Sequence, residues 1–127
     1  MTNESATRTA RLSLLAVLPA LALGACALLA VHGSMKDASA HLEAARVEAD
    51  AGRWTRADEE VARVEALFAG PAIADFNDEA SYVELHGALM TDLERLRRSL
   101  QAGGDARTEE QFDRTTRACA NCHDVYD

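Results

Sequence analysis

Apolar residues recur every three or four positions through most of the chain after Val31, and this spacing constrains the fold more than any other feature. Such a repeat places one apolar stripe along an α-helix, whereas a half-buried strand would alternate at every second residue. Only two prolines interrupt the 127 residues, 48% of which are hydrophobic but only 5% aromatic. The sequence therefore predicts an all-α fold with a core built mainly from alanine and leucine.

The apolar stripes predict four helices, which cover residues 34–51, 54–68, 78–100 and the stretch from Thr108 onward. Gly52, the Gly70-Pro71 pair and the Gly103-Gly104 pair follow the first three stripes, and these residue types commonly end helices. Short connections between consecutive helices favour antiparallel neighbours. We therefore expect an up-down-up-down four-helix bundle.

An uncharged run of 20 residues, Leu12 to Val31, precedes the bundle and follows Arg8 and Arg11. Twenty residues with a rise of ~1.5 Å each span the ~30 Å hydrocarbon core of a bilayer. Arginines before such a run hold its N-terminal side in the cytoplasm, so the remainder is exported. The run predicts a periplasmic protein that is tethered to the cytoplasmic membrane.

The same N-terminal segment has two further interpretations. It also fits a signal peptide that is cleaved near Gly24 or Ala25. Leu23 to Cys26 resembles a bacterial lipobox, which would make Cys26 a lipidation site. In each case residues 1–33 form a signal peptide or transmembrane anchor, and residues 34–127 form the folded domain.

The formal net charge of −8 bears on the kind of partner. Nucleic-acid binding depends on Lys and Arg side chains that neutralise phosphates, so an acidic chain of this size argues against it. Acidic surfaces favour partners with basic patches, although a high net charge also serves solubility alone.

Five residues near the C-terminus, Cys119-Ala120-Asn121-Cys122-His123, match the C-x-x-C-H signature of covalent haem attachment. Two thiols about one helical turn apart can add to the two vinyl groups of one porphyrin, and the adjacent imidazole can bind the iron. A redox-active thiol pair and half of a zinc site are the alternatives. The first lacks the α/β context of thioredoxin-like proteins, and zinc would need a fourth ligand.

With this motif in the last helix of an exported bundle, the chain resembles the class II c-type cytochromes, the cytochrome c-prime and cytochrome c-556 family. Tyr126 occupies the family's H-x-x-[FY] position, whereas Asp127 ends the chain where the family commonly has a basic residue. The resemblance implies one covalent haem c and a non-enzymatic role in one-electron transfer between redox partner proteins. It implies as an alternative a five-coordinate haem that binds NO or CO, and a homodimer formed through the first two helices.

The residue opposite His123 decides between these roles, because a strong sixth ligand closes the iron to gases. His123 lies 17 residues after Ala106 and Met35 lies 17 residues before Gly52, so equal helical rise places both at one level. A first-helix methionine is also the sixth ligand in the c-556 branch that this sequence resembles. Met35 is the predicted ligand, with His86 or no residue as alternatives; Met35 and His86 can also be simple packing residues.

Overall fold

The computed structural model describes the backbone of residues 4–126 and the side chains of residues 25–126. All regular secondary structure in the described residues is helical, which confirms the all-α prediction for this part of the protein. They are α1 (Glu4–Asp50), α2 (Trp54–Ala69), α3 (Pro71–Ala74), α4 (Ala80–Gln101) and α5 (Ala106–Tyr126).

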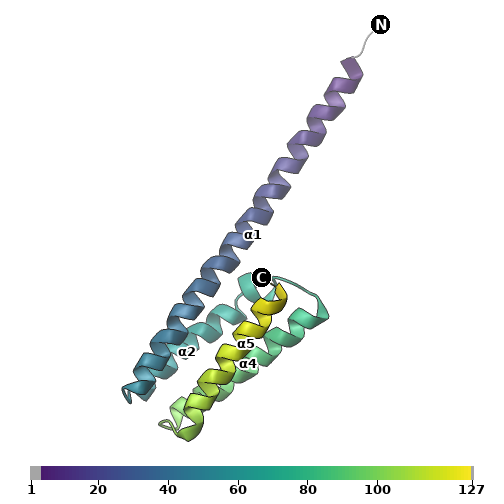
Figure 1. The fold of residues 1–127 in the computed structure, drawn as a ribbon. Helices are drawn as coiled ribbons and strands as arrows, with labels where there is room; N and C mark the ends of the chain where they lie inside the picture. Colours follow the sequence, from purple (N-terminus) through teal and green to yellow (C-terminus); the bar gives the residue numbers. More distant parts are fainter. Residues whose placement is uncertain (1–3, 127) are drawn as a thin grey trace.

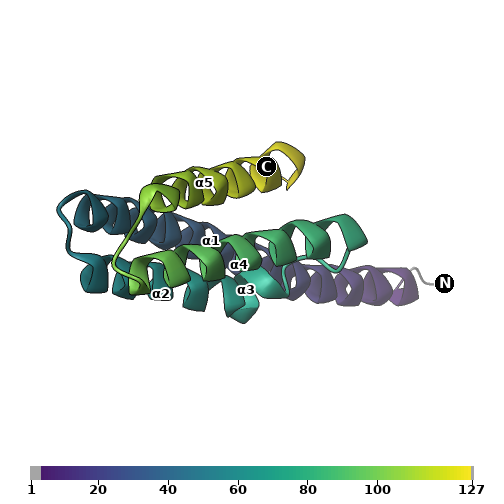
Figure 2. The same ribbon diagram turned by 90° about the horizontal axis from the view of Figure 1, so that it is seen from below.

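Consecutive long helices run in opposite directions and lie side by side (Figure 1). α1 packs against α2, α2 against α4, and α4 against α5, while the short α3 contacts α1 and α2. The α1–α2 and α4–α5 turns lie at one end of the molecule, and the C-terminus lies at the other end (Figure 1). At that second end, α1 extends beyond the remaining helices (Figures 1 and 2).

The core consists of the apolar stripes that the sequence predicts. α1 contributes alanines to the core, and these small side chains let α1 approach its neighbour α2 closely. α4 contributes mainly leucines. The fully or nearly fully buried apolar residues are Ala38, Ala45, Ala49, Ala57, Val61, Val64, Phe68, Ile73, Tyr82, Leu89, Leu93, Leu96, Leu100 and Phe112.

Glycines with positive φ end α1 and shape the α4–α5 turn, as the sequence predicts. Gly52 has a φ of 72° and Gly104 a φ of 71°, a region that other residues rarely adopt. Only a residue without a side chain fits at position 104, because a Cβ there would lie 2.5 Å from Cη2 and Cζ3 of Trp54. The Trp54 ring at the start of α2 thus packs on the α4–α5 turn and joins the two turns.

Besides α4, which begins at Ala80 and not at residue 78, three helix starts differ from the sequence predictions. α5 begins at Ala106, before Thr108, because the Asp105 carboxylate accepts a hydrogen bond from the Arg107 amide at 2.8 Å. The Thr108 hydroxyl in turn accepts one from the Asp105 amide at 3.0 Å. α3 was not predicted: Pro71, expected only to stop the preceding helix, stands in its first turn.

The third difference concerns α1, which was expected to start at Ser34. In the structure, α1 passes through residues 31–35 without a break. Gly33 is the one poor helix former in that stretch, and a single glycine costs only about 1 kcal/mol relative to alanine. The predicted division at residue 33 therefore falls inside a helix.

The predicted anchor or signal segment at residues 1–33 lies largely outside the residues whose side chains are described. Within the described part of the chain, no helix is both long and apolar enough to cross a bilayer.

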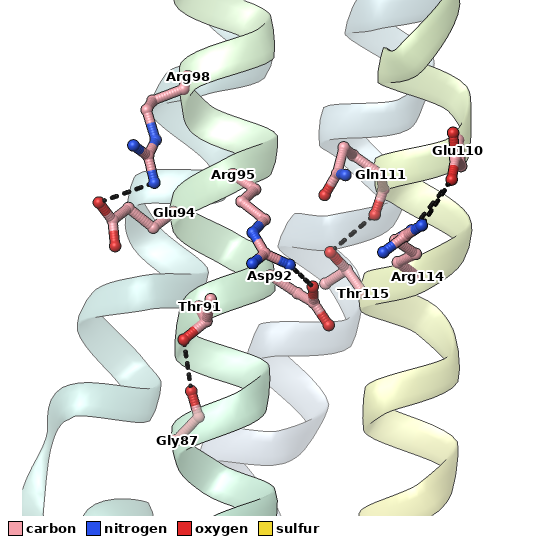
Figure 3. A network of polar contacts seen from close by, with 10 residues as sticks. All are labelled: Gly87, Thr91, Asp92, Glu94, Arg95, Arg98, Glu110, Gln111, Arg114 and Thr115. Atoms are coloured by element: carbon pink, nitrogen blue, oxygen red, sulfur yellow. Dashed lines mark hydrogen bonds and ion pairs between the residues drawn. The ribbon is translucent and has the colours of Figure 1, made fainter.

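Ion pairs cover the outer faces of the helices. Figure 3 shows pairs within α4 and within α5, such as Arg98 with Glu94 and Arg114 with Glu110. A more buried network joins α2 to α4, where Arg97 donates to Asp58 at 2.8 Å and to Glu65 at 3.0 Å. Such cross-helix pairs fix the α2–α4 contact more than the exposed pairs within one helix do.

Candidate functional site

A cavity of about 170 Å³ lies between α1 and α5, closed from behind by α2 and α4. Met35 of α1 and the motif residues Cys119, Cys122 and His123 of α5 all line it. Its remaining lining residues are Ala38, Ser39, Leu42, Val64, Phe68, Leu89 and Thr116. The structure thus places the predicted haem-binding residues Cys119, Cys122 and His123 at one cavity with Met35, the predicted sixth ligand.

The packing of α1 and α5 explains why this space exists. About one to three turns from the cavity, the two helices are joined by Arg46, which donates to Asp113 at 3.0 Å and lies 5.1 Å above the centroid of the Phe112 ring. Toward Met35 and Cys122 the facing residues include the small Ala38 and Ser39. The small side chains of α1 leave space between the two helices.

The chemistry of the lining fits an apolar ligand. Leu42, Val64, Phe68 and Leu89 supply most of the inner wall. The cavity therefore combines an apolar wall with two thiols, an imidazole and a thioether, which is a donor set suited to a covalently held haem.

α5 positions the two thiols in its last two turns. Cys119 and Cys122 are free and partly buried, three residues apart on one helix, and Cys119 packs against the core cluster. Their spacing brings both sulfurs to the same face of α5. Thr116, one further turn back on that face, donates its hydroxyl to the Phe112 carbonyl at 3.0 Å and also lines the cavity.

Burial raises the pKa of the Cys119 thiol to about 11, and the neighbouring Cys122 adds to the shift. Burial also raises the pKa of Cys122. Reactive C-x-x-C pairs owe their nucleophilicity to a lowered thiol pKa. The shift is therefore opposite to the one that a thiol–disulfide exchange site requires.

His86 does not line the cavity, and its ring contacts other groups. Its Nε2 donates to the backbone carbonyl of Phe68 at 2.7 Å, and its ring stacks on Tyr82 with centroids 6.3 Å apart. His86 is absent from the lining of this cavity and from that of the adjoining hollow, both of which border His123. The contacts favour the interpretation of His86 as a packed, hydrogen-bonded histidine.

A second hollow, of about 220 Å³, adjoins the first at the end where α1 leaves the bundle. Met35, Cys122 and His123 line both hollows, which makes these three residues the boundary between them. The rest of the second lining consists of Leu28, Val31, His32, Phe76, Tyr82 and Tyr126.

Tyr126 is held at this second hollow by α4. Its hydroxyl bonds to Ser81 and, at 3.3 Å, to the carboxylate of Glu79, while its ring meets Tyr82 edge-on at 5.2 Å. These contacts fix the last turn of α5, and with it His123, against the start of α4.

A third hollow, of about 320 Å³, lies between α4 and α5 and is mainly polar. Arg114 and Arg117 line it, and Arg114 also pairs with Glu110 at 2.8 Å. Neither arginine lines the cavity that contains the cysteines.

The inner wall of the cavity was not assigned to a site from the sequence. Leu42, Val64, Phe68 and Leu89 were predicted only as core residues, because helix periodicity identifies an apolar face but not which part of it borders a cavity. A spacing signal exists for Thr116 alone, since it precedes Cys119 by three residues on one helix face.

Among residues 25–126, no three His, Cys, Asp or Glu side chains gather into a metal-binding group. Comparison of the chain with known protein families, curated proteins and solved structures gives no match.

Proposed function

We propose that this chain is an exported c-type cytochrome that carries one covalent haem c and transfers single electrons. Cys119 and Cys122 would hold the haem through thioether bonds, and His123 would bind its iron. The observation that carries the proposal is the shared cavity: Met35 of α1 lines it together with the whole C-x-x-C-H motif of α5. A haem supplies reversible one-electron exchange, and the protein sets its potential through the axial ligands and burial.

Met35 is the proposed sixth ligand. Its thioether lies on α1, 88 residues before His123, yet both side chains border the same two hollows. Cytochromes with His and Met ligands have raised potentials and no open position on the iron. The hydrogen bond from His86 to Phe68 supports Met35 over His86 for this role.

Within this proposal, the helices form the up-down-up-down four-helix bundle of the cytochrome c-prime and c-556 family. Residues 1–33 are its anchor or signal segment, and the protein is periplasmic and held at the cytoplasmic membrane. The partners are redox proteins, and the chain is not an enzyme. A homodimer through the first two helices belongs to the same family resemblance.

One observation favours a second candidate, a five-coordinate haem that binds NO or CO. The inner wall of the cavity, formed by Leu42, Val64, Phe68 and Leu89, is apolar and offers no strong ligand. If Met35 does not bind the iron, a small apolar gas has space beside it.

Absorption spectra of the full-length holoprotein separate the candidates. We expect low-spin spectra in both oxidation states that CO does not change. A high-spin reduced form that shifts with CO would support the gas-binding alternative, and the absence of a haem band would contradict both and leave a thiol pair.

Replacement of Met35 tests the sixth ligand. We expect Met35→Ala to convert the low-spin spectrum to high spin and to make the reduced protein bind CO. His86→Ala serves as the matched control and should leave the low-spin spectrum unchanged. A low-spin spectrum that survives in Met35→Ala would refute Met35 as the ligand.

A further inference from the structure

The second hollow opens onto an exposed apolar surface at the end of the molecule where α5 ends. Phe76 and Val125 are 38% and 60% exposed there. Phe76 reaches the ring of Tyr82 at 6.0 Å and Tyr82 reaches Tyr126 at 5.2 Å. The loop before α4 and the last turn of α5 are therefore joined through the buried Tyr82, and Phe76 and Tyr126 both line the second hollow beside Cys122 and His123.

The sequence around this surface contains acidic residues but few basic ones. No Lys or Arg occurs between Arg63 and Arg95, a stretch that includes α3, the loop before α4 and the first half of α4. The exposed charged residues of the loop before α4, the start of α4 and the last turn of α5 are all acidic: Asp75, Asp78, Glu79, Glu84 and Asp124. On α1, Lys36 is followed directly by Asp37, so that helix adds no net positive charge.

The opposite end of the molecule carries both basic and acidic side chains. Most arginines lie on the half of the bundle near the two turns, where several pair with carboxylates: Arg46, Arg53, Arg56, Arg97, Arg98, Arg107 and Arg114. Carboxylates thus occur at both ends, but those at the end that bears the motif have few basic neighbours, whereas those at the other end lie among arginines.

We propose that this end, named the acidic face and defined by Asp75, Phe76, Asp78, Glu79 and Val125, is the docking surface for a redox partner protein with a basic rim around an apolar patch. The inference rests on the proposed function, and it specifies where the electron leaves or enters. A partner on the acidic face contacts the surface next to Cys122 and His123, which shortens the path to the proposed haem.

Charge selects this occupant over two others. A second copy of the chain would bring one acidic face against another, and like charges in contact cost several kcal/mol. Anionic lipid headgroups would be repelled for the same reason. A basic partner gains attraction over long range and needs only a small contact, as transient electron-transfer complexes do.

The test uses the full-length holoprotein in neutral detergent, after its covalent haem band has been verified. Zinc-substituted mitochondrial cytochrome c, a small basic redox protein, is the probe, and quenching of its triplet state by the oxidised holoprotein gives the electron-transfer rate. We expect a fast rate at about 10 mM salt that falls at least tenfold at about 150 mM salt, because the Debye length shrinks.

A pair of charge-reversal variants locates the surface. Asp75→Lys with Asp78→Lys changes two exposed side chains for which the structure shows no ion pair, and should lower the low-salt rate at least tenfold. Asp50→Lys with Glu59→Lys makes the same change in net charge at the other end and should lower it about twofold. Equal effects of the two pairs would overturn the proposal, because net charge alone would then explain the rate.

Val125→Ser tests the exposed apolar residue that α5 contributes to the acidic face. We expect a lower rate by a similar factor at both salt concentrations, because this residue contributes contact and not steering. No change at either concentration would overturn the apolar part of the proposal.

Two further results would assign the acidic face to another occupant. A rate that falls to background when the holoprotein is moved into anionic nanodiscs would mean that lipid covers the face. A dimer in detergent that Asp75→Lys with Asp78→Lys dissociates would mean that a second copy covers it. A missing haem band in the wild type would instead refute the proposed function before any docking is measured.

Discussion

Replacing Arg97 with methionine removes the guanidinium that ties α4 to α2. Nε and Nη2 of Arg97 donate to the two oxygens of Asp58 at 2.8 and 3.3 Å, and Nη1 donates to Glu65 at 3.0 Å. Methionine keeps an apolar stem of similar length, so packing is largely preserved. The variant leaves two carboxylates of α2 partly buried without their shared cation.

The magnitude follows from the exposure of the three side chains. Arg97, Asp58 and Glu65 are 28%, 18% and 29% exposed, which lies between surface and interior. Exposed pairs contribute about 0.2–1 kcal/mol, and removal of one partner of a buried pair costs about 3–5 kcal/mol. We expect Arg97→Met to lower the free energy of unfolding by about 2 kcal/mol, or the Tm by roughly 10 °C.

The pH dependence of this loss has a definite sign. Partial burial raises the pKa of Asp58, but hydrogen bonds from Arg97 and Gln101 and the Arg97 charge outweigh it, so the pKa lies below its usual value of 3.8. A lowered folded-state pKa adds stability above the unfolded-state value and loses it as the pH falls through the folded-state value. The cost of Arg97→Met should therefore be full near neutral pH and shrink below about pH 4.

Urea unfolding followed by circular dichroism measures the loss, with Arg98→Met as the matched control. Arg98 is the next residue of α4, and it pairs only with Glu94, at 3.2 Å with both side chains more than 60% exposed (Figure 3). We expect that variant to lose less than about 0.5 kcal/mol. Equal losses for the two variants, or a loss for Arg97→Met that does not shrink in acid, would refute the reasoning.

Two further substitutions test the turn and the histidine. Gly104→Ala should lower the free energy of unfolding by about 2 kcal/mol or more, because its Cβ would meet the Trp54 ring, whereas Gly103→Ala, with φ of 85° and open space around it, should cost only about 1 kcal/mol in the same urea experiment. A Gly103→Ala loss as large as that of Gly104→Ala would mean that the ring contact is unimportant. His86→Ala should cost about 1–3 kcal/mol in thermal unfolding, because the Phe68 carbonyl loses its donor; an unchanged Tm would argue against that hydrogen bond in solution.

Helix ends were predictable from the sequence where one residue type determines the backbone. Gly52 ends α1 and Gly103 with Gly104 shape the α4–α5 turn, and all three have positive φ. The start of α5 was missed because the capping bonds of Asp105 and Thr108 are reciprocal, and a hydroxyl at position 108 suggested a cap when it is already within the first turn.

The candidate site was predictable in part. Equal helical rise from the two turns indicated that Met35 and His123 share a level, and both line one cavity in the structure. The gap between α1 and α5 was not predictable, because it depends on how far two helices that are not adjacent in sequence stand apart. Arg46, which joins those helices through Phe112 and Asp113, carried no sequence signal for that role.

Covalent attachment of a single haem is the most direct test of the central claim. The full-length chain is expressed with haem-maturation machinery, denatured, and measured by intact mass spectrometry together with its haem absorption. We predict a mass increase of one haem that survives denaturation and is lost when Cys119 and Cys122 are both replaced by alanine. An unmodified mass, or haem that dissociates on denaturation, would contradict the account.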